Sequence, residues 1–253
     1  MTATDPILDI AELGVWFGGL AAVSDLSLSV ARGSVTSVIG PNGAGKSTLF
    51  NLISGAVAAN SGRVVFEGND VTGWPAQRIN RAGLARSFQI TNLFPDLEVA
   101  ENLRLAAQVL EPAGRGLFPP RRSRRALAKM RSLLERFGLE AKAEELAGYL
   151  SHGEQRRLEV AMTLASEPRL LLLDEPTQGM SHGDTRDTAA LIRELSSELT
   201  VLLIEHDIDL VMDLSDWIVV MHQGRKLAEG PPEVVHADPA VRRAYFGEAD
   251  SHA

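Results

Sequence analysis

A glycine-rich stretch that ends in a lysine and two hydroxyl residues is the first part of the chain suited to chemistry. It reads GPNGAGKST, from Gly40 to Thr48, and matches the pattern G-x-x-x-x-G-K-[ST]. In this pattern glycines let backbone N–H groups wrap phosphate oxygens without Cβ clashes. Lys46 supplies a positive charge to the β- and γ-phosphates, and the Ser47 hydroxyl is a ligand for Mg²⁺. The stretch therefore predicts a site for a nucleoside triphosphate and its magnesium ion.

Two carboxylates and a histidine follow apolar runs farther along the chain. RLLLLDEP places Asp174 and Glu175 after one run, and VLLIEHD places His206 after another. Asp174 is suited to hold Mg²⁺ through its water shell, and Glu175 to orient or deprotonate an attacking water. His206 becomes a candidate because ligands bind where parallel strands end. Each feature is weak alone, but beside the glycine-rich loop they predict hydrolysis of the nucleotide.

The elements that position these residues are strands alternating with helices. The glycine-rich loop lies between a short β-rich run and a helix, which is the context that its pattern requires. Three continuous apolar runs have the length of strands, and such runs are typical of parallel strands buried on both faces. The predicted strands are 24–30, 35–40, 63–68, 169–174, 200–205 and 217–221, and the predicted helices among them are 46–55 and 184–198. This order predicts a βαβ sheet with right-handed crossovers.

A block without strand signals interrupts the predicted sheet. It runs from about Val99 to Glu167, and segments 103–110 and 126–139 carry helical spacing. It reads as a helical insertion. Within it, GRGLFPPRRSRR at 114–125 is rich in Pro, Gly and Arg. This segment is either a solvated loop between helices or a contact for anionic lipid headgroups or an acidic partner.

The composition limits the possible classes of protein. The chain has 253 residues, of which 45% are hydrophobic, and its formal net charge is −8. This charge argues against a non-specific nucleic-acid binder. The absence of Cys excludes disulfides, zinc sites built on Cys and thiol catalysis. The longest apolar runs are far shorter than a membrane span, so work at a membrane requires docking onto another protein.

A second stretch also has the features of an anion site. LSHGEQRRLEVAM runs from Leu150 to Met162, and Ser151 and Gly153 stand at the start of a predicted helix. The first backbone N–H groups of a helix are unpaired and carry the positive end of its dipole, which suits an anion. The sequence alone gives no reason for two such sites in one chain.

Taken together, these motifs resemble the nucleotide-binding subunit of ATP-binding cassette (ABC) transporters along almost the whole chain. GPNGAGKST resembles the Walker A loop of that family, LLLLDE its Walker B strand, and SFQ with Gln89 its Q-loop. LSHGE resembles the LSGGQ signature, and His206 the switch histidine. Phe17 in VWFGG stands where the family places an aromatic ring on adenine, although the adjacent Trp16 could be a core residue or share that role.

The resemblance implies ATP and Mg²⁺ as cofactors and a role for each matching residue. The implied catalytic residues are Glu175, His206 and Gln89, and the implied magnesium contacts are Ser47, Gln89 and Asp174. The implied ATP contacts within one chain are Phe17, Gly40, Asn42, Gly43, Ala44, Gly45, Lys46, Ser47 and Thr48. Because ABC ATPases pair head to tail, Ser151, His152, Gly153 and Glu154 are expected to contact the ATP of a second ATPase subunit. That arrangement explains the second anion site.

Three positions depart from the family pattern. His152 replaces the usual Gly of the signature, and Glu154 replaces its Gln. His152 is expected either to pack at the subunit interface or to donate to the γ-phosphate. In QGMSHGD, Ser181 stands where an Asp is usual, which puts the intersubunit contact of this loop in question.

Finer features resemble the ATPase subunits of bacterial branched-chain amino acid uptake systems. The stretches that carry this likeness are LARSFQITNLFPDLEVAEN, EPTQGM and DPAVRRAYFGE. Urea and amide importers are the close alternative and exporters a more distant one. A DNA-repair or translation ATPase lacks support because the chain has one cassette and no long heptad array. A small-molecule kinase would leave LSHGE, Gln89 and His206 unexplained, and a module that binds ATP without hydrolysing it would not need Glu175 or His206.

The resemblance also implies partners and a place in the cell. The partners are transmembrane permease subunits, a second ATPase subunit that is identical or paralogous, and a solute-binding protein, with no nucleic acid. The chain is expected at the cytoplasmic face of the inner membrane as a peripheral protein.

The expected fold is α/β. It combines a P-loop NTPase (RecA-like) core with a parallel sheet, an antiparallel β subdomain and an inserted α-helical signature subdomain. In one ABC ATPase domain of 1–253, residues 1–89 and 166–253 form the core, the β subdomain and the C-terminal helices, and 90–165 form the helical subdomain.

Overall fold

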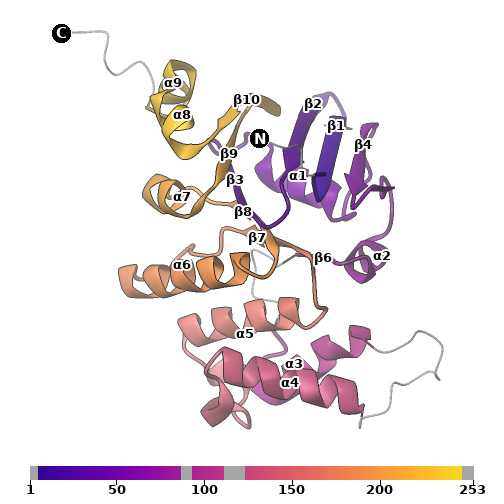
Figure 1. Cartoon of the computed structure of the whole chain (residues 1–253), viewed down its shortest axis with the longest axis vertical. Coiled ribbons are helices and arrows are strands. Elements are labelled where there is room, and N and C mark those ends of the chain that lie inside the picture. Colours follow the sequence, from indigo (N-terminus) through magenta and orange to yellow (C-terminus); the bar gives the residue numbers. More distant parts are fainter. Residues whose placement is uncertain (1–4, 87–92, 111–122, 247–253) are drawn as a thin grey trace.

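The computed structural model describes residues 5–86, 93–110 and 123–246, and a six-stranded sheet forms its centre (Figure 1). The strand order is β10-β9-β3-β8-β7-β6. The five strands from β9 to β6 are parallel, and β10 pairs with β9 in the antiparallel sense. The strands are β3 (Val35–Ile39), β6 (Leu84–Arg86), β7 (Leu170–Asp174), β8 (Thr200–Ile204), β9 (Trp217–His222) and β10 (Arg225–Gly230). The predicted parallel sheet is confirmed.

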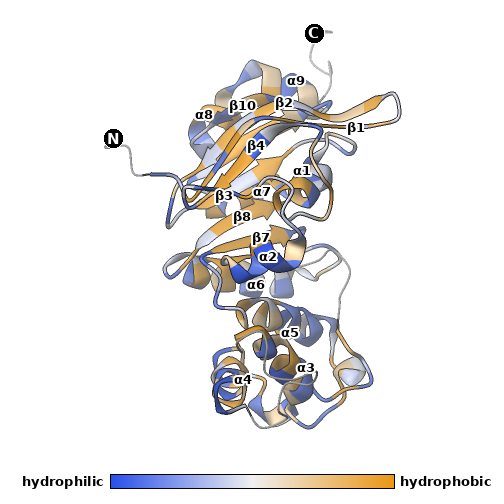
Figure 2. Ribbon diagram, turned by 90° about the vertical axis from the view of Figure 1, so that its right-hand side faces the viewer, coloured by the Kyte–Doolittle hydropathy of each residue, from blue (hydrophilic) through white to orange (hydrophobic). Residues whose placement is uncertain are grey.

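Both faces of this sheet are covered, as the continuous apolar runs indicated. Every residue of β7 and β8 is buried. Leu170 and Leu172 belong to one hydrophobic cluster, whereas Leu171 and Leu173 belong to another on the opposite face. Successive side chains of a strand point to opposite faces, so a strand between two cores needs no polar position. The strands of both sheets are largely orange in the hydropathy view (Figure 2).

A second, antiparallel sheet packs over one face of the first. Its order is β2-β1-β4-β5. The strands are β1 (Leu8–Phe17), β2 (Leu20–Val30), β4 (Ser61–Phe66) and β5 (Asn69–Asp70). The helix α1 (Lys46–Ile53) lies between the sheets, and its fully buried Phe50 shares a core with strands of both. The predicted antiparallel subdomain is confirmed.

The sequence pattern did not reveal β1. Its pairing with β2 shifts register at three places, and Glu12 has a φ of 51°. Such irregularities place two consecutive residues against one on the partner strand and disrupt the alternation of apolar and polar positions. The pattern of burial along β1 is accordingly irregular, which explains why a search for alternation does not find it.

The predicted helical block is present and forms one end of the molecule (Figure 1). Its α-helices are α3 (Val99–Ala106), α4 (Arg124–Arg136) and α5 (His152–Leu164), and its short 3₁₀ helices are η1 (Ala107–Leu110), η2 (Glu140–Lys142) and η3 (Ala147–Tyr149). Apolar residues of α3, α4 and α5 share one continuous core with β7, β8 and α6 (His182–Ser196). The block therefore packs firmly on the sheet through α5 and α6. The boundaries after residues 89 and 165 stay a prediction.

Four short helices complete the part of the chain that the structure describes. They are α2 (Ala76–Arg81), α7 (Ile208–Leu214), α8 (Pro232–Ala237) and α9 (Pro239–Phe246). Apolar residues of α7, α8 and α9 pack on β3 and β9, and α8 and α9 lie at the end opposite the helical block (Figure 1). In the described part of the chain, no helix is both long and apolar enough to cross a membrane.

Candidate active site

The glycine-rich loop joins the end of β3 to the start of α1. Gly40, Gly43 and Gly45 have φ values of 154°, 79° and 99°. A Cβ on Gly40 would lie 2.2 Å from the Met221 carbonyl oxygen, and one on Gly45 would lie 2.5 Å from that of Ala22. Glycine is therefore needed at these two positions for close approach of backbone as well as for conformation. Gly45 caps α1 without a side-chain hydrogen bond, so the first N–H groups of the helix remain available to an anion.

Lys46 is folded back over this loop. Its Nζ donates to the carbonyl oxygens of Gly40 at 2.6 Å and Pro41 at 3.1 Å. A lysine ammonium has three donors, so two hold the loop and one remains for a phosphate oxygen. Burial lowers the pKa of Lys46, and the nearby carboxylates of Glu175 and Asp174 oppose that shift. The Lys46 side chain thus both stabilises the conformation of the loop and places a positive charge in it.

An open pocket of about 940 Å³ extends from the loop to the β1–β2 hairpin. Its volume is ample for a nucleotide, since small-molecule sites typically measure roughly 300–1,000 Å³. Predicted ATP contacts account for much of its lining, which comprises Phe17, Leu20, Ala21, Ala22, Asn42, Gly43, Ala44, Gly45, Lys46, Ser47, Thr48, Glu175, Gln223 and Gly224. Gln223 and Gly224, at the turn between β9 and β10, were not predicted from the sequence.

The two aromatic candidates for adenine stacking point to different surroundings. Phe17 lines the pocket and is 52% exposed, which leaves its ring available to a flat ligand. The Trp16 ring instead lies over Gly14, close enough that a Cβ there would be 3.0 Å from it. Successive side chains of a strand point to opposite faces, which explains the divergence. The geometry supports Phe17 as the stacking residue.

Asp174, the last residue of β7, has one carboxylate oxygen engaged and one open. Arg86 at the end of β6 donates to its Oδ2 at 2.9 Å, and also to Asn51 Oδ1 and Ser54 Oγ of the α1 segment. Within the described residues, Oδ1 of Asp174 is buried and has no hydrogen-bond partner. A buried oxygen without a partner is rare, and an ion or a water commonly accounts for it. Together with the exposed hydroxyl residue Ser47 at the start of α1, this oxygen suits the water shell of Mg²⁺.

Glu175 directly follows β7 in a left-handed conformation, with a φ of 47°. Its backbone N–H donates to the carbonyl oxygen of Ile204 at 2.9 Å, as if the strand pairing continued. For a non-glycine residue this conformation is uncommon and is often found at functional sites. It turns the Glu175 side chain into the lining of the pocket. The placement fits a carboxylate that handles water beside the phosphates.

His206 is the second residue after β8, which ends at Ile204. Because β8 pairs with both β3 and β7, all three strands end at the same edge of the sheet. The side chain of His206 is 57% exposed, and its Nδ1 lies 3.6 Å from Oε2 of Glu205. It does not line the 940 Å³ pocket with Glu175. Gln89, the third predicted catalytic residue, lies outside the described residues.

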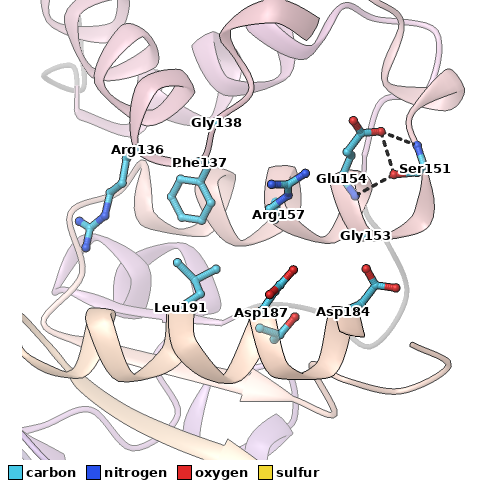
Figure 3. Close-up of a pocket in the computed structure, with 11 residues that line it drawn as sticks. Arg136, Phe137, Gly138, Ser151, Gly153, Glu154, Arg157, Asp184, Asp187 and Leu191 are labelled. Atoms are coloured by element: carbon cyan, nitrogen blue, oxygen red, sulfur yellow. Dashed lines mark hydrogen bonds between the residues drawn. The ribbon is translucent and has the colours of Figure 1, made fainter. Parts of the chain in front are cut away.

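The signature stretch forms a closed capping box at the start of α5 (Figure 3). The Ser151 N–H and hydroxyl both donate to Glu154 Oε2 at 2.8 Å, and the Glu154 N–H donates back to Ser151 Oγ at 3.4 Å. These hydrogen bonds from Ser151 lower the pKa of Glu154. Glu154 therefore has a structural role that the resemblance did not indicate. His152 begins α5 and is exposed.

Ser151, Gly153 and Glu154 line a separate pocket of about 390 Å³ between α4, α5 and α6. Figure 3 shows Arg157 of α5 facing Asp184 and Asp187 of α6 across it. As far as the described residues show, this pocket has no lining residue in common with the pocket at the glycine-rich loop. Within one chain, the two anion-binding features are therefore separate.

One functional candidate that the sequence did not reveal is Arg156, a buried arginine on α5. It forms an ion pair with Glu159, also buried, and donates to the carbonyl oxygens of Pro176 at 3.2 Å and Asp174 at 3.5 Å. These carbonyls flank Glu175, so the helix of the signature stretch is tied to the loop of the candidate base. The only hint in the sequence is the i, i+3 spacing of opposite charges on an otherwise apolar helix face.

Comparisons with known proteins show which family the chain resembles. Residues 23–178 match the model of the ABC transporter family, and residues 225–251 match that of the branched-chain amino acid ATP-binding cassette transporter family. The high-affinity branched-chain amino acid transport ATP-binding protein BraF of Pseudomonas aeruginosa is 43% identical, covering 96% of this chain and 99% of that protein. The corresponding protein LivG of Escherichia coli is 41% identical, covering 97% and 100%.

Solved structures show the same fold. An ATP-binding cassette of an ABC transporter superposes with a TM-score of 0.86 at 32% identity, covering 96% of this chain and 99% of the other. A nucleotide-free cassette gives a TM-score of 0.85, also at 32% identity, with coverages of 96% and 100%. Given the matched family model and two relatives that are 43% and 41% identical over nearly its whole length, the chain belongs to the ABC transporter family, as an ATP-binding subunit that hydrolyses ATP to drive transport.

Proposed function

We propose that this chain energises the uptake of branched-chain amino acids. The observation that carries the choice of solute is the nearly full-length similarity to BraF and LivG, both named for high-affinity transport of these amino acids. The match of the C-terminal residues to the branched-chain family model supports it independently. Urea or amide uptake is the alternative. Recognition of the solute belongs to the transmembrane permease subunits and a solute-binding protein.

The solute assignment is tested by transport into vesicles that contain this chain with its permease subunits and solute-binding protein. We expect ATP-dependent accumulation of radiolabelled leucine, isoleucine and valine, and no accumulation of urea or acetamide. The Glu175→Gln complex serves as the control for transport that does not depend on hydrolysis. Accumulation of urea or acetamide without any of the three amino acids would replace this proposal with the alternative.

At the nucleotide, Phe17 stacks on adenine, and the residues of the glycine-rich loop surround the phosphates, with Lys46 contacting the β- and γ-phosphates. Ser47 and Asp174 hold the magnesium ion, which supplies positive charge to the phosphates when it is bound. The buried Oδ1 of Asp174, which has no hydrogen-bond partner among the described residues, supports this role. Gln89 is a further proposed contact of the ion and of the attacking water.

Glu175 is the proposed general base, and His206 the residue that contacts the γ-phosphate. Glu175 lines the phosphate pocket, whereas His206 is exposed at the adjacent strand end. An exposed imidazole beside the pocket is accessible to the third phosphate of ATP. Together the two side chains would restrict hydrolysis to a nucleotide that is fully engaged.

A second ATPase subunit completes each site. Ser151, His152, Gly153 and Glu154 of one chain lie at the γ-phosphate held by the other chain, in a head-to-tail dimer. The separation of the two pockets within one chain supports this arrangement. The partner is a second copy or a paralogue.

Mixing two inactive variants tests the shared site. Ser151→Arg blocks closure by bulk and charge but leaves the glycine-rich loop of its own chain intact. Lys46→Ala weakens ATP binding by roughly tenfold or more, since hydrogen bonds of charged groups contribute about 1.5–3 kcal/mol, but leaves its own signature usable. A mixed dimer then contains one intact site and one doubly damaged site. We expect phosphate release from the mixture to exceed the sum of the two variants measured separately.

The contrary result is also well defined. If Ser151→Arg alone hydrolyses ATP at the wild-type rate, and this rate per molecule does not fall on dilution, the site is complete within one chain. The control is Ser196→Arg, a substitution at the far end of α6 that leaves both half-sites untouched.

The permease contact is proposed at residues 90–97 and the adjoining η3 turn. Phe94 is 51% and Tyr149 is 81% exposed, which is unusual for large aromatic side chains. The buried Asn102 holds the Phe94 backbone by accepting from its N–H at 2.8 Å and donating to its carbonyl at 3.1 Å. Gly148 donates its N–H to the carbonyl oxygen of Pro95 at 3.0 Å, which joins the two segments that carry these exposed rings. Binding there would place the chain at the cytoplasmic face of the inner membrane as a peripheral subunit.

A further inference from the structure

Glu205 is a fully buried carboxylate between two loops of the active site. Its Oε1 accepts from the N–H of Thr177 at 3.0 Å and from the Thr177 hydroxyl at 2.5 Å. Its Oε2 accepts from the N–H of His206 at 3.1 Å. The side chain of Glu205 is 0% exposed. The carboxylate is therefore satisfied by hydrogen bonds from two segments of the chain, and neither oxygen contacts solvent.

The two segments that Glu205 joins are those that carry the proposed catalytic groups. Thr177 stands two residues after Glu175, and His206 is the next residue along the chain. The Nδ1 atom of His206 lies 3.6 Å from Oε2. Within the described parts of the chain, this imidazole is the only basic side chain within 4 Å of the carboxylate, since the ion pairs found there include no Lys or Arg partner for Glu205.

We propose that Glu205 is a positioning residue that fixes His206 relative to Glu175. One oxygen holds the loop after β7, and the other oxygen attracts Nδ1 of the His206 ring. A carboxylate on this side favours a proton on Nδ1, because the partner of one imidazole nitrogen determines the state of the ring. The Nε2 atom is then left for the γ-phosphate. This inference rests on the proposed function, because it assigns Glu205 to the same hydrolysis.

A carboxylate is the side chain that this position requires. Glutamine has almost the same shape but presents one oxygen and one NH₂ group. Its NH₂ group would face either the Thr177 donors or the His206 N–H, so a donor would oppose a donor. Glu205→Gln therefore keeps the packing but breaks the hydrogen bonds at one of the two positions that the carboxylate oxygens occupy. Thr177→Val weakens the hydrogen bonding of Oε1 more mildly, because it removes the hydroxyl donor and leaves the backbone N–H in place.

The first test is a double-mutant cycle on ATP turnover in the full chain with saturating Mg²⁺ and ATP. We expect Glu205→Gln to lower kcat by about tenfold, with KM for ATP changed by less than about twofold, because one hydrogen bond to a charged group is lost. In a His206→Ala background, the same change should lower kcat by less than about twofold. Glu198→Gln, an exposed carboxylate just before β8, is the matched control and should leave kcat unchanged.

Equal losses in both backgrounds, or no loss from Glu205→Gln, would overturn the proposal. If Glu205→Gln does not elute as folded protein on gel filtration, Thr177→Val replaces it in the same cycle. Its loss of kcat should be smaller, because the backbone N–H still donates, and that loss should again largely disappear in the His206→Ala background. The failure of the proposed function gives a different result, because His206→Ala alone would then turn over ATP like the wild type.

The second test is independent of turnover and reads the state of the imidazole. Imidazole ¹⁵N NMR spectra of the full chain are assigned for His206 by comparison with His206→Ala. We expect the wild type to show a protonated Nδ1, and Glu205→Gln to show a redistribution between Nδ1 and Nε2 at the same pH. Identical His206 signals in the two proteins would mean that Glu205 does not position the ring.

Discussion

Glu175→Gln is expected to bind ATP with nearly wild-type affinity and to hydrolyse it at least about 10²-fold more slowly, the scale of losing a general base. Glutamine fits the same space, so the left-handed turn after β7 and the bond from its N–H to Ile204 are retained. Because ATP stays intact, the closed pair of subunits should also persist on gel filtration. Phosphate release and calorimetry measure the two quantities separately.

The matched control is Glu12→Gln. Glu12 also has a positive φ, of 51°, but it is exposed on the antiparallel sheet at the second residue after Ile10. The Glu12→Gln variant should hydrolyse ATP at the wild-type rate. If Glu175→Gln retains near-normal turnover, another group is the base and the position of Glu175 in the pocket has a different purpose.

The second large effect concerns stability. Arg156→Met is expected to lower the free energy of unfolding by about 3–5 kcal/mol, because it leaves the buried Glu159 carboxylate without its cation. The carbonyl oxygens of Asp174 and Pro176 lose a donor as well. Urea unfolding followed by circular dichroism measures the change. Arg157→Met, at the next and exposed position of α5, is the control and should shift stability by less than about 0.5 kcal/mol.

Replacing both Arg156 and Glu159 distinguishes the effect of losing the ion pair from the effect of losing side-chain packing. The double variant Arg156→Met with Glu159→Leu removes the buried charge along with its partner, so it should recover part of the stability of the single variant. If Arg156→Met costs no more than Arg157→Met, the ion pair at this junction contributes nothing to the fold.

The extent to which the sequence predicted this structure depends on the range of the interactions involved. The glycine-rich loop, β3, β7 and β8 could be identified because their patterns are local and continuous. The strand β1 was missed because bulges interrupt its alternation, and β6 was missed because it has only three residues. The helices α7, α8 and α9 are short, and their apolar positions have meaning only against the sheet that they cover.

In the candidate site, the sequence indicated which residues to consider but not how they are held. Arg86 reaches Asp174 across 88 positions of sequence, and Thr177 reaches Glu205 across 28. No periodicity relates such partners, since they meet only when strands that are distant in sequence become neighbours in the sheet. The choice between Phe17 and Trp16 likewise required the pairing of β1, which decides the face to which each ring points.

The capping box of the signature stretch has a thermodynamic consequence for the transport cycle. Ser151 has one hydroxyl hydrogen, and in the separate chain it is already donated to Glu154. In the proposed head-to-tail pair, a γ-phosphate held by the partner subunit would therefore replace one anionic acceptor with another and would gain no additional hydrogen bond from the Ser151 hydroxyl. The net enthalpy of that contact is small. A closed state that gains little from this contact would open readily once the phosphate is cleaved, as the proposed cycle of pairing and separation requires.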